Sequence, residues 1–172
     1  MSTDIKIPEF DTKRIHLRGG VLTDIDPLDA FFSSDDSRYV GGPNPRAHTW
    51  QALCAGIGHW ALRGFGLWML TDKADGTVMG VAGLQQPDGY PEPELIWVIF
   101  NEFSGQGLAK EAVNGIRGFI AREYGITRPI SLLYPEYKTV VKMAESIGAQ
   151  RIEDIEIPDG LVPAWRHAEP GV

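Results

Sequence analysis

The sequence lacks the features that mark several large classes of protein. Cys54 is the only cysteine among 172 residues, so an internal disulfide and a cysteine-based zinc site are excluded, and we expect a buried thiol. There is no basic run, and the formal net charge is -7, so nucleic acid is not an expected partner. No apolar stretch is long enough to cross a bilayer, so a membrane partner is not expected either.

Two further absences concern targeting and metals. The first ten residues carry Asp4, Lys6 and Glu9 and have no apolar signal-peptide core, which predicts a cytoplasmic protein. The four histidines are scattered without the spacing of metal ligands, so no metal is expected.

What is present is the composition of an ordinary globular domain. Hydrophobic residues make up 43% of the chain and charged residues 23%, and we expect residues 1–172 to form one domain. Hairpins come first and strands alternate with helices later, which predicts a mixed α/β fold in one layered domain. Strands are expected at 13–18, 66–71, 77–84, 95–100, 129–134, 151–157 and 163–167, and helices at 26–32, 47–62, 107–124 and 139–147.

The segment from Phe100 to Ala112 is the most informative, because it joins an apolar strand to a long amphipathic helix through a short turn. Gly105 and Gly107 allow a ligand to approach the backbone closely, and the free N–H groups of a helix start favour an anion such as pyrophosphate. The alternative is that the two glycines only make a tight turn.

Three phosphate-binding designs compete for this loop. A Walker loop needs a Lys-Ser/Thr pair after its second glycine, and the sequence has none. A dinucleotide fingerprint needs a glycine where Lys110 stands, and it belongs in a repeated βαβ unit, so a nucleotide-binding oxidoreductase is disfavoured. The third design is an acyl-CoA loop.

The stretch Ser104–Ala109, followed by 110–113, resembles the pyrophosphate motif Arg/Gln-x-x-Gly-x-Gly/Ala of the GNAT superfamily of N-acetyltransferases. The segments 66–71, 78–84, 93–100 and 142–149 resemble further GNAT segments in the same order, and 12–18 resembles the opening strand of the RimJ/RimL-like branch, which modifies protein N-terminal amines. The resemblance implies a single-domain GNAT fold, with a mostly antiparallel twisted sheet of about seven strands flanked by about four helices.

The resemblance also implies an activity. Acetyl-CoA would serve as co-substrate, and its acetyl group would pass directly to a primary amine, on a protein N-terminus or a small molecule, in a ternary complex. Similar proteins are monomers or dimers, so a homodimer is possible. The residues implied in cofactor binding are Val98, Ile99 and Phe100 for the pantetheine arm and the thioester carbonyl, and Ser104, Gly105, Gln106, Gly107, Leu108 and Ala109 for the pyrophosphate.

Glu94, just before the apolar strand, is the candidate general base, because an amine must lose a proton to attack a thioester. The alternative is a surface glutamate like Glu92. The tyrosine that many relatives use to protonate the leaving thiolate is replaced by Ala144, so Tyr137 or its neighbour Tyr134 becomes the candidate acid, unless both only pack at a turn.

The missing tyrosine keeps a rival hypothesis open. A non-catalytic acyl-CoA-binding or sensing module with the same fold would need no proton donor at Ala144, whereas it would have no use for a base at Glu94.

Overall fold

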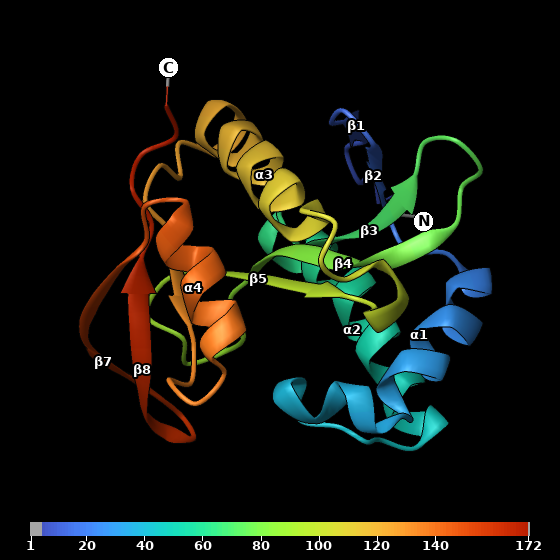
Figure 1. Cartoon of the computed structure of the whole chain (residues 1–172), viewed down its shortest axis with the longest axis horizontal. Helices are drawn as coiled ribbons and strands as arrows, with labels where there is room; N and C mark the ends of the chain where they lie inside the picture. The colour runs from blue at the N-terminus through green and yellow to red at the C-terminus, as the bar shows by residue number, and fades with distance from the viewer. Residues whose placement is uncertain (1–4, 172) are drawn as a thin grey trace.

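The computed structural model describes residues 5–171, whose strands form one eight-stranded sheet in the order β1-β2-β3-β4-β5-β6-β8-β7 (Figure 1). Neighbouring strands are antiparallel except β5 and β6, which are parallel. The strands are β1 (Phe10–Asp11), β2 (Ile15–Arg18), β3 (Leu67–Asp72), β4 (Val78–Gln85), β5 (Glu94–Ile99), β6 (Ile130–Leu132), β7 (Gln150–Ile157) and β8 (Gly160–Arg166).

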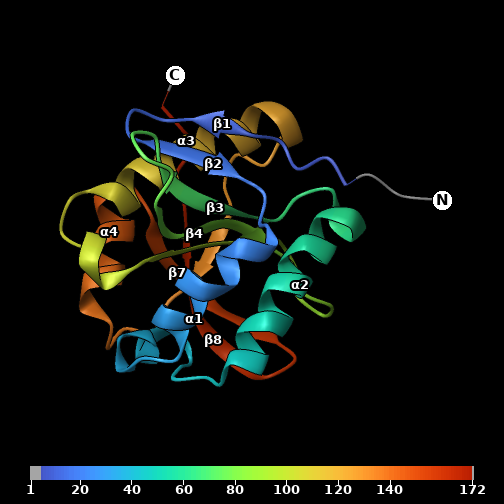
Figure 2. The ribbon, with the colours of Figure 1, turned by 90° about the vertical axis from the view of Figure 1, so that its right-hand side faces the viewer.

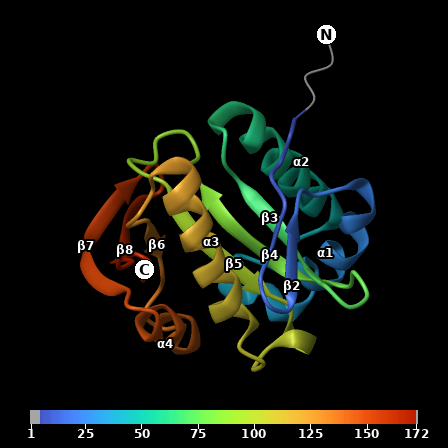
Figure 3. The ribbon, with the colours of Figure 1, turned by 90° about the horizontal axis from the view of Figure 1, so that it is seen from above.

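Helices cover both faces of the sheet. Helices α3 and α4 lie over one face and α1 and α2 over the other (Figures 1 and 3). The described residues form α1 (Ile25–Phe32), α2 (Arg46–Arg63), α3 (Leu108–Tyr124) and α4 (Lys138–Ser146), with short 3-10 helices η1 (Leu22–Asp24), η2 (Asp35–Val40) and η3 (Asn101–Phe103). The predicted mixed α/β class and the mostly antiparallel sheet are confirmed, with one strand more than expected, since β1 was not foreseen.

Strand β5 is apolar because both of its faces are covered. Leu95 and Trp97 join the core cluster with α3 and α4, whereas Val98 joins the cluster with α1 and α2. Phe100, just after the strand, stacks on Phe31 of α1 with ring centroids 5.0 Å apart. Successive side chains of a strand point to opposite faces, so burial on both sides requires a continuous apolar run.

The β3–β4 hairpin is the one predicted from Asp75-Gly76. Gly76 has φ 79°, a left-handed conformation that glycine adopts without strain. Gly83 of β4 is needed for a different reason, because a Cβ there would lie 2.3 Å from the carbonyl oxygen of Gly66.

Some local expectations were wrong. The predicted loop 33–45 contains η2, a six-residue 3-10 helix. Cys54 lies on α2, whose course is seen in Figure 2, and is exposed rather than buried. Among the described residues, no helix has both the length and the apolar character needed to cross a bilayer.

Candidate functional site

The centre of the sheet opens where β5 and β6 separate. The two strands share one residue pair, Glu94 with Ile130. Beyond this pair, the hydrogen bonds between the two strands are made by side chains to backbone groups. Glu94 Oε1 accepts a hydrogen bond from the Leu132 N–H at 3.3 Å, and Ser131 Oγ donates to the Leu95 carbonyl at 2.5 Å. Within residues 5–171, the rest of β5 therefore has no strand beside it on this edge.

The direction of the peptide groups along β5 decides which of them face the gap. The Phe100 N–H donates to the Met79 carbonyl on β4 at 2.9 Å. Peptide groups of a strand point alternately to its two sides, so those of Val98 also face β4, while those of Trp97 and Ile99 face the gap. Of the three residues expected to contact a pantetheine arm, Ile99 alone turns its peptide group to the open side.

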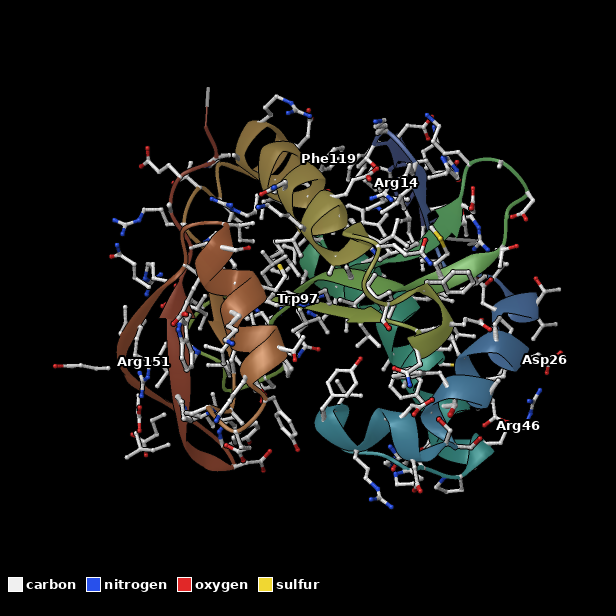
Figure 4. The ribbon with its side chains drawn as sticks, viewed as in Figure 1. Arg14, Asp26, Arg46, Trp97, Phe119 and Arg151 are labelled. Atoms are coloured by element: carbon white, nitrogen blue, oxygen red, sulfur yellow. The ribbon has the colours of Figure 1, made fainter. Side chains whose placement is uncertain are left out.

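A cleft of about 720 Å³ lies between the start of α3, the start of α4 and the open side of β5; we name it the helix-start cleft. Trp97 lies at its floor, between α3 and α4 (Figure 4). Gln106 of the predicted loop lies instead on the far side, beside Arg14. The predicted loop residues that line the cleft are Ser104, Gly105, Gly107, Leu108 and Ala109, together with Ile99 of β5.

The α3 end of this cleft suits an anion. In the described part of the chain, the backbone N–H groups of residues 105–110 have no hydrogen-bond acceptor. Gly105 and Gly107 have φ of 74° and 76°, which turn the chain sharply into the helix. The helix dipole adds partial positive charge at this end, and the side chains of Lys110 and Lys138 line the same cleft.

An ion pair anchors the loop from behind. Arg14 Nε donates to Glu111 Oε2 at 2.7 Å, and Arg14 Nη1 donates to the Gln106 carbonyl at 3.0 Å. Thr12 Oγ1 also donates to Glu111, at 2.7 Å. Sequence reasoning missed these residues, because the turn before β2 meets α3 only through the fold.

A second cavity, of about 370 Å³, lies on the α1 side of the gap; we name it the Glu94 cavity. Its lining residues come from α1, β3, β4, β5, β6, η2, the segment before α4 and the start of α4 itself. The Glu94 cavity and the helix-start cleft adjoin, because four residues line both: Tyr39, Trp97, Tyr137 and Val140.

Glu94 is a buried carboxylate at the wall of this cavity. Its exposed fraction is 6%, and its Oε2 accepts a hydrogen bond from Gln85 Nε2 at 2.9 Å. Burial raises the pKa of Glu94 above its ordinary value, and the hydrogen bonds from Gln85 and Leu132 oppose that rise only in part. A carboxyl with a raised pKa is better matched to proton transfer near neutral pH than a solvated one.

The two candidate tyrosines differ in position. Tyr137 lines both cavities and donates its hydroxyl to the Arg38 carbonyl at 3.5 Å. Tyr134 lines the Glu94 cavity and is 49% exposed. Ala144 is fully buried in the core against α3, so it offers no group to either cavity.

A buried pair holds the far side of the gap. Ser131 Oγ lies 2.9 Å from His167 Nε2, and because its single proton goes to the Leu95 carbonyl, the imidazole must donate from Nε2. Burial lowers the pKa of His167 to about 4, with the positive charge of Arg117 contributing, so the imidazole is neutral near pH 7. The pair fixes where β6 stands relative to β5.

Within residues 5–171, no three His, Cys, Asp or Glu side chains gather closely enough to hold a metal ion. The groups that the described residues present at the site are one buried carboxylate, nearby phenols and a row of free N–H groups.

Comparison with known proteins places this geometry in a family. The acetyltransferase (GNAT) domain family matches residues 14–150. An acetyltransferase from Agrobacterium tumefaciens superposes with a TM-score of 0.88 at 26% identity, over 95% of this chain and 96% of that one.

Two more distant structures share the fold. The ribosomal-protein-S5-alanine acetyltransferase from Vibrio fischeri superposes with a TM-score of 0.69 at 14% identity, over 94% of this chain and 95% of that one. The aminoglycoside acetyltransferase AAC(6')-Ib, in complex with paromomycin and acetyl-CoA, gives 0.74 at 15% identity, over 91% and 94%. With most of its length matched by the family and its sheet opened beside a glycine-rich helix start, this chain belongs to the GNAT acetyltransferase family.

Proposed function

We propose that this protein transfers the acetyl group of acetyl-CoA directly to a primary amine while both are bound. The observation that carries the proposal is the junction of two spaces. A cleft with free N–H groups at a helix start adjoins, at Tyr137, a cavity that is lined by the buried carboxylate of Glu94. A donor with phosphates and an acceptor with a proton to lose could meet at that junction.

The helix-start cleft fits acetyl-CoA, which supplies the acetyl group as a thioester. The N–H groups of residues 105–109 bind its pyrophosphate, with Lys110 and Lys138 adding positive charge. The peptide groups of Trp97 and Ile99 bind the amide-bearing arm on the open side of β5. A β5 N–H also stabilises the charge that develops on the thioester carbonyl oxygen.

Proton transfers fall to two side chains. Glu94 accepts the proton that the acceptor amine loses as its nitrogen bonds to the acetyl carbon. The carbon–sulfur bond breaks, and Tyr137, at the junction of the two cavities, protonates the departing thiolate. Tyr137 takes the role of the tyrosine that many relatives carry at the position of Ala144.

Turnover with an amine tests the function. Purified protein is incubated with acetyl-CoA and a panel of small amines and N-terminal peptides, and free thiol is measured. We expect thiol release that depends on an amine and falls strongly in Glu94→Gln, but not in Glu92→Gln. Glu92 is a fair control, because its carboxylate pairs with Arg166 at 2.6 Å rather than lining the Glu94 cavity.

A non-catalytic acyl-CoA module remains the second candidate, favoured by Ala144. It predicts acetyl-CoA binding by calorimetry without thiol release for any amine. Failure to bind acetyl-CoA at all would overturn both functions.

A further inference from the structure

The Glu94 cavity is unusual for its single charge. Among its described lining side chains, Glu94 is the only carboxylic acid, and none is Lys, Arg or His. The remaining polar lining side chains are one amide, Gln85, and three phenols, and the rest are apolar.

The guanidinium of Arg38, whose backbone contacts the cavity-lining Tyr137, is engaged elsewhere. Arg38 presents its backbone carbonyl to Tyr137, but its side chain pairs with Asp35 at 2.8 Å and is 69% exposed. The described lining of the cavity therefore has no cationic side chain that could pair with an anionic group on a ligand.

From this charge pattern we propose that the acceptor is a primary amine with a single positive charge on an apolar body, without a second ammonium or a carboxylate. The inference rests on the proposed function and specifies its substrate class. One ammonium can pair with Glu94 before it loses its proton. A second charge taken into the same cavity would be desolvated without a partner, which costs several kcal/mol per ion.

The apolar wall favours the same class. Ile96 and Val98 follow Glu94 on the same face of β5, and Val81 of β4 lies beside them. A hydrocarbon body that leaves water against these side chains gains free energy in proportion to the area it buries.

A matched series tests the inference. Hexylamine, 1,6-diaminohexane and 6-aminohexanoic acid have the same chain length and end in a methyl, an ammonium and a carboxylate. We expect kcat/KM for hexylamine to exceed that for each of the other two by about 10²-fold, with thiol release from acetyl-CoA as the readout.

A paired substitution gives an independent reading. Ile96 lies two residues from Glu94, roughly 7 Å along the strand, and it is only partly buried, so a polar residue can be placed there. Ile96→Asp should raise the ratio of 1,6-diaminohexane to hexylamine turnover by about tenfold or more, because it supplies the missing partner. Ile96→Asn, of similar size and without charge, should leave the ratio unchanged.

The possible outcomes distinguish failure of this substrate-class inference from failure of the acetyltransferase function on which it rests. If the diamine, the amino acid or an alanine-led tripeptide is acetylated as well as hexylamine or better, the inference is overturned and the acetyltransferase function stands. If no amine releases thiol although acetyl-CoA binds, the function fails and the inference fails with it. A ratio that rises equally in Ile96→Asp and Ile96→Asn would also contradict the charge argument.

Discussion

The carboxylate of Glu94 binds a backbone group of β6: its Oε1 accepts the Leu132 N–H at 3.3 Å, two residues beyond Ile130, with which Glu94 is paired in the sheet. A strand carbonyl would otherwise accept that N–H. The same group thus holds the edge of the gap and faces the Glu94 cavity, which is 370 Å³ in volume. Removing its charge should affect chemistry and stability in opposite directions.

Glu94→Gln should lower kcat by about 10²–10⁴-fold, the usual cost of losing a general base, while acetyl-CoA affinity stays within about threefold. In the unchanged protein, kcat/KM should rise with pH as the carboxyl ionises and then level off. This rise of kcat/KM with pH should be absent from Glu94→Gln. Full activity of Glu94→Gln over the whole pH range would assign the proton to another group.

The stability of Glu94→Gln should increase at neutral pH. A carboxyl whose pKa is raised by folding favours the folded state below its unfolded pKa, and that contribution is lost as pH rises through the folded pKa. Urea unfolding at pH 4 and pH 7 measures the effect. The variant should be more stable than the unchanged protein at pH 7 but not at pH 4. A variant that is less stable than the unchanged protein at pH 7 would show that Glu94 is stabilised as the anion.

Tyr137→Phe and Tyr134→Phe form a matched pair for the acid. Tyr137 lines both cavities, so loss of its hydroxyl should lower kcat by about 10²-fold with little change in KM for the acceptor. Tyr134 lines only the Glu94 cavity and should have a much smaller effect on kcat. Equal losses in the two variants would point to packing of the turn rather than to proton donation.

Gly107→Val should abolish acetyl-CoA binding measured by calorimetry at 25 °C. Its φ of 76° costs a side chain about 1–2 kcal/mol, and relaxation would turn the helix-start N–H groups away from the cleft. Gly118→Ala, in the middle of α3, is the control. Its Cβ would meet only the movable end of Arg122, so it should keep binding and gain up to about 1 kcal/mol of stability. Unchanged binding by Gly107→Val would remove the loop from the cofactor site.

His167 should make the fold sensitive to mild acid. Its pKa is about 4 in the folded protein against 6.5 for a free side chain, so the unfolded chain takes up the proton first as pH falls. Stability present at pH 7 is lost progressively from about pH 6.5 to pH 4, by about 3 kcal/mol in all, at 1.36 kcal/mol per pKa unit.

Urea unfolding of His167→Gln provides the comparison for that pH effect. Other groups titrate in both proteins, so the informative quantity is the difference between the two pH profiles. The difference in the free energy of unfolding between the unchanged protein and His167→Gln should decrease by about 2 kcal/mol from pH 7 to pH 5. Parallel profiles would mean that the imidazole is not held neutral.

The local pattern of the sequence determined most of the elements. The apolar run of β5 predicted a strand covered on both faces, Asp75-Gly76 predicted the β3–β4 hairpin, and the periodic spacing of α3 predicted a helix after a glycine turn. These features depend on residues close together in the chain, which is why they could be read without a structure. The short strand β1 has only two residues and too little pattern to be foreseen.

What the tertiary structure alone decided is how these elements meet. The separation of β5 from β6 depends on Ser131 and Glu94, which come from strands far apart in the sequence. The anchoring of the helix-start loop depends on Arg14 reaching Glu111, 97 residues away. The catalytic roles of Glu94 and Tyr137 stay predictions, but their setting comes from the fold. Burial raises a pKa and two cavities share a wall only when distant segments pack together, and no local spacing in the chain encodes that packing.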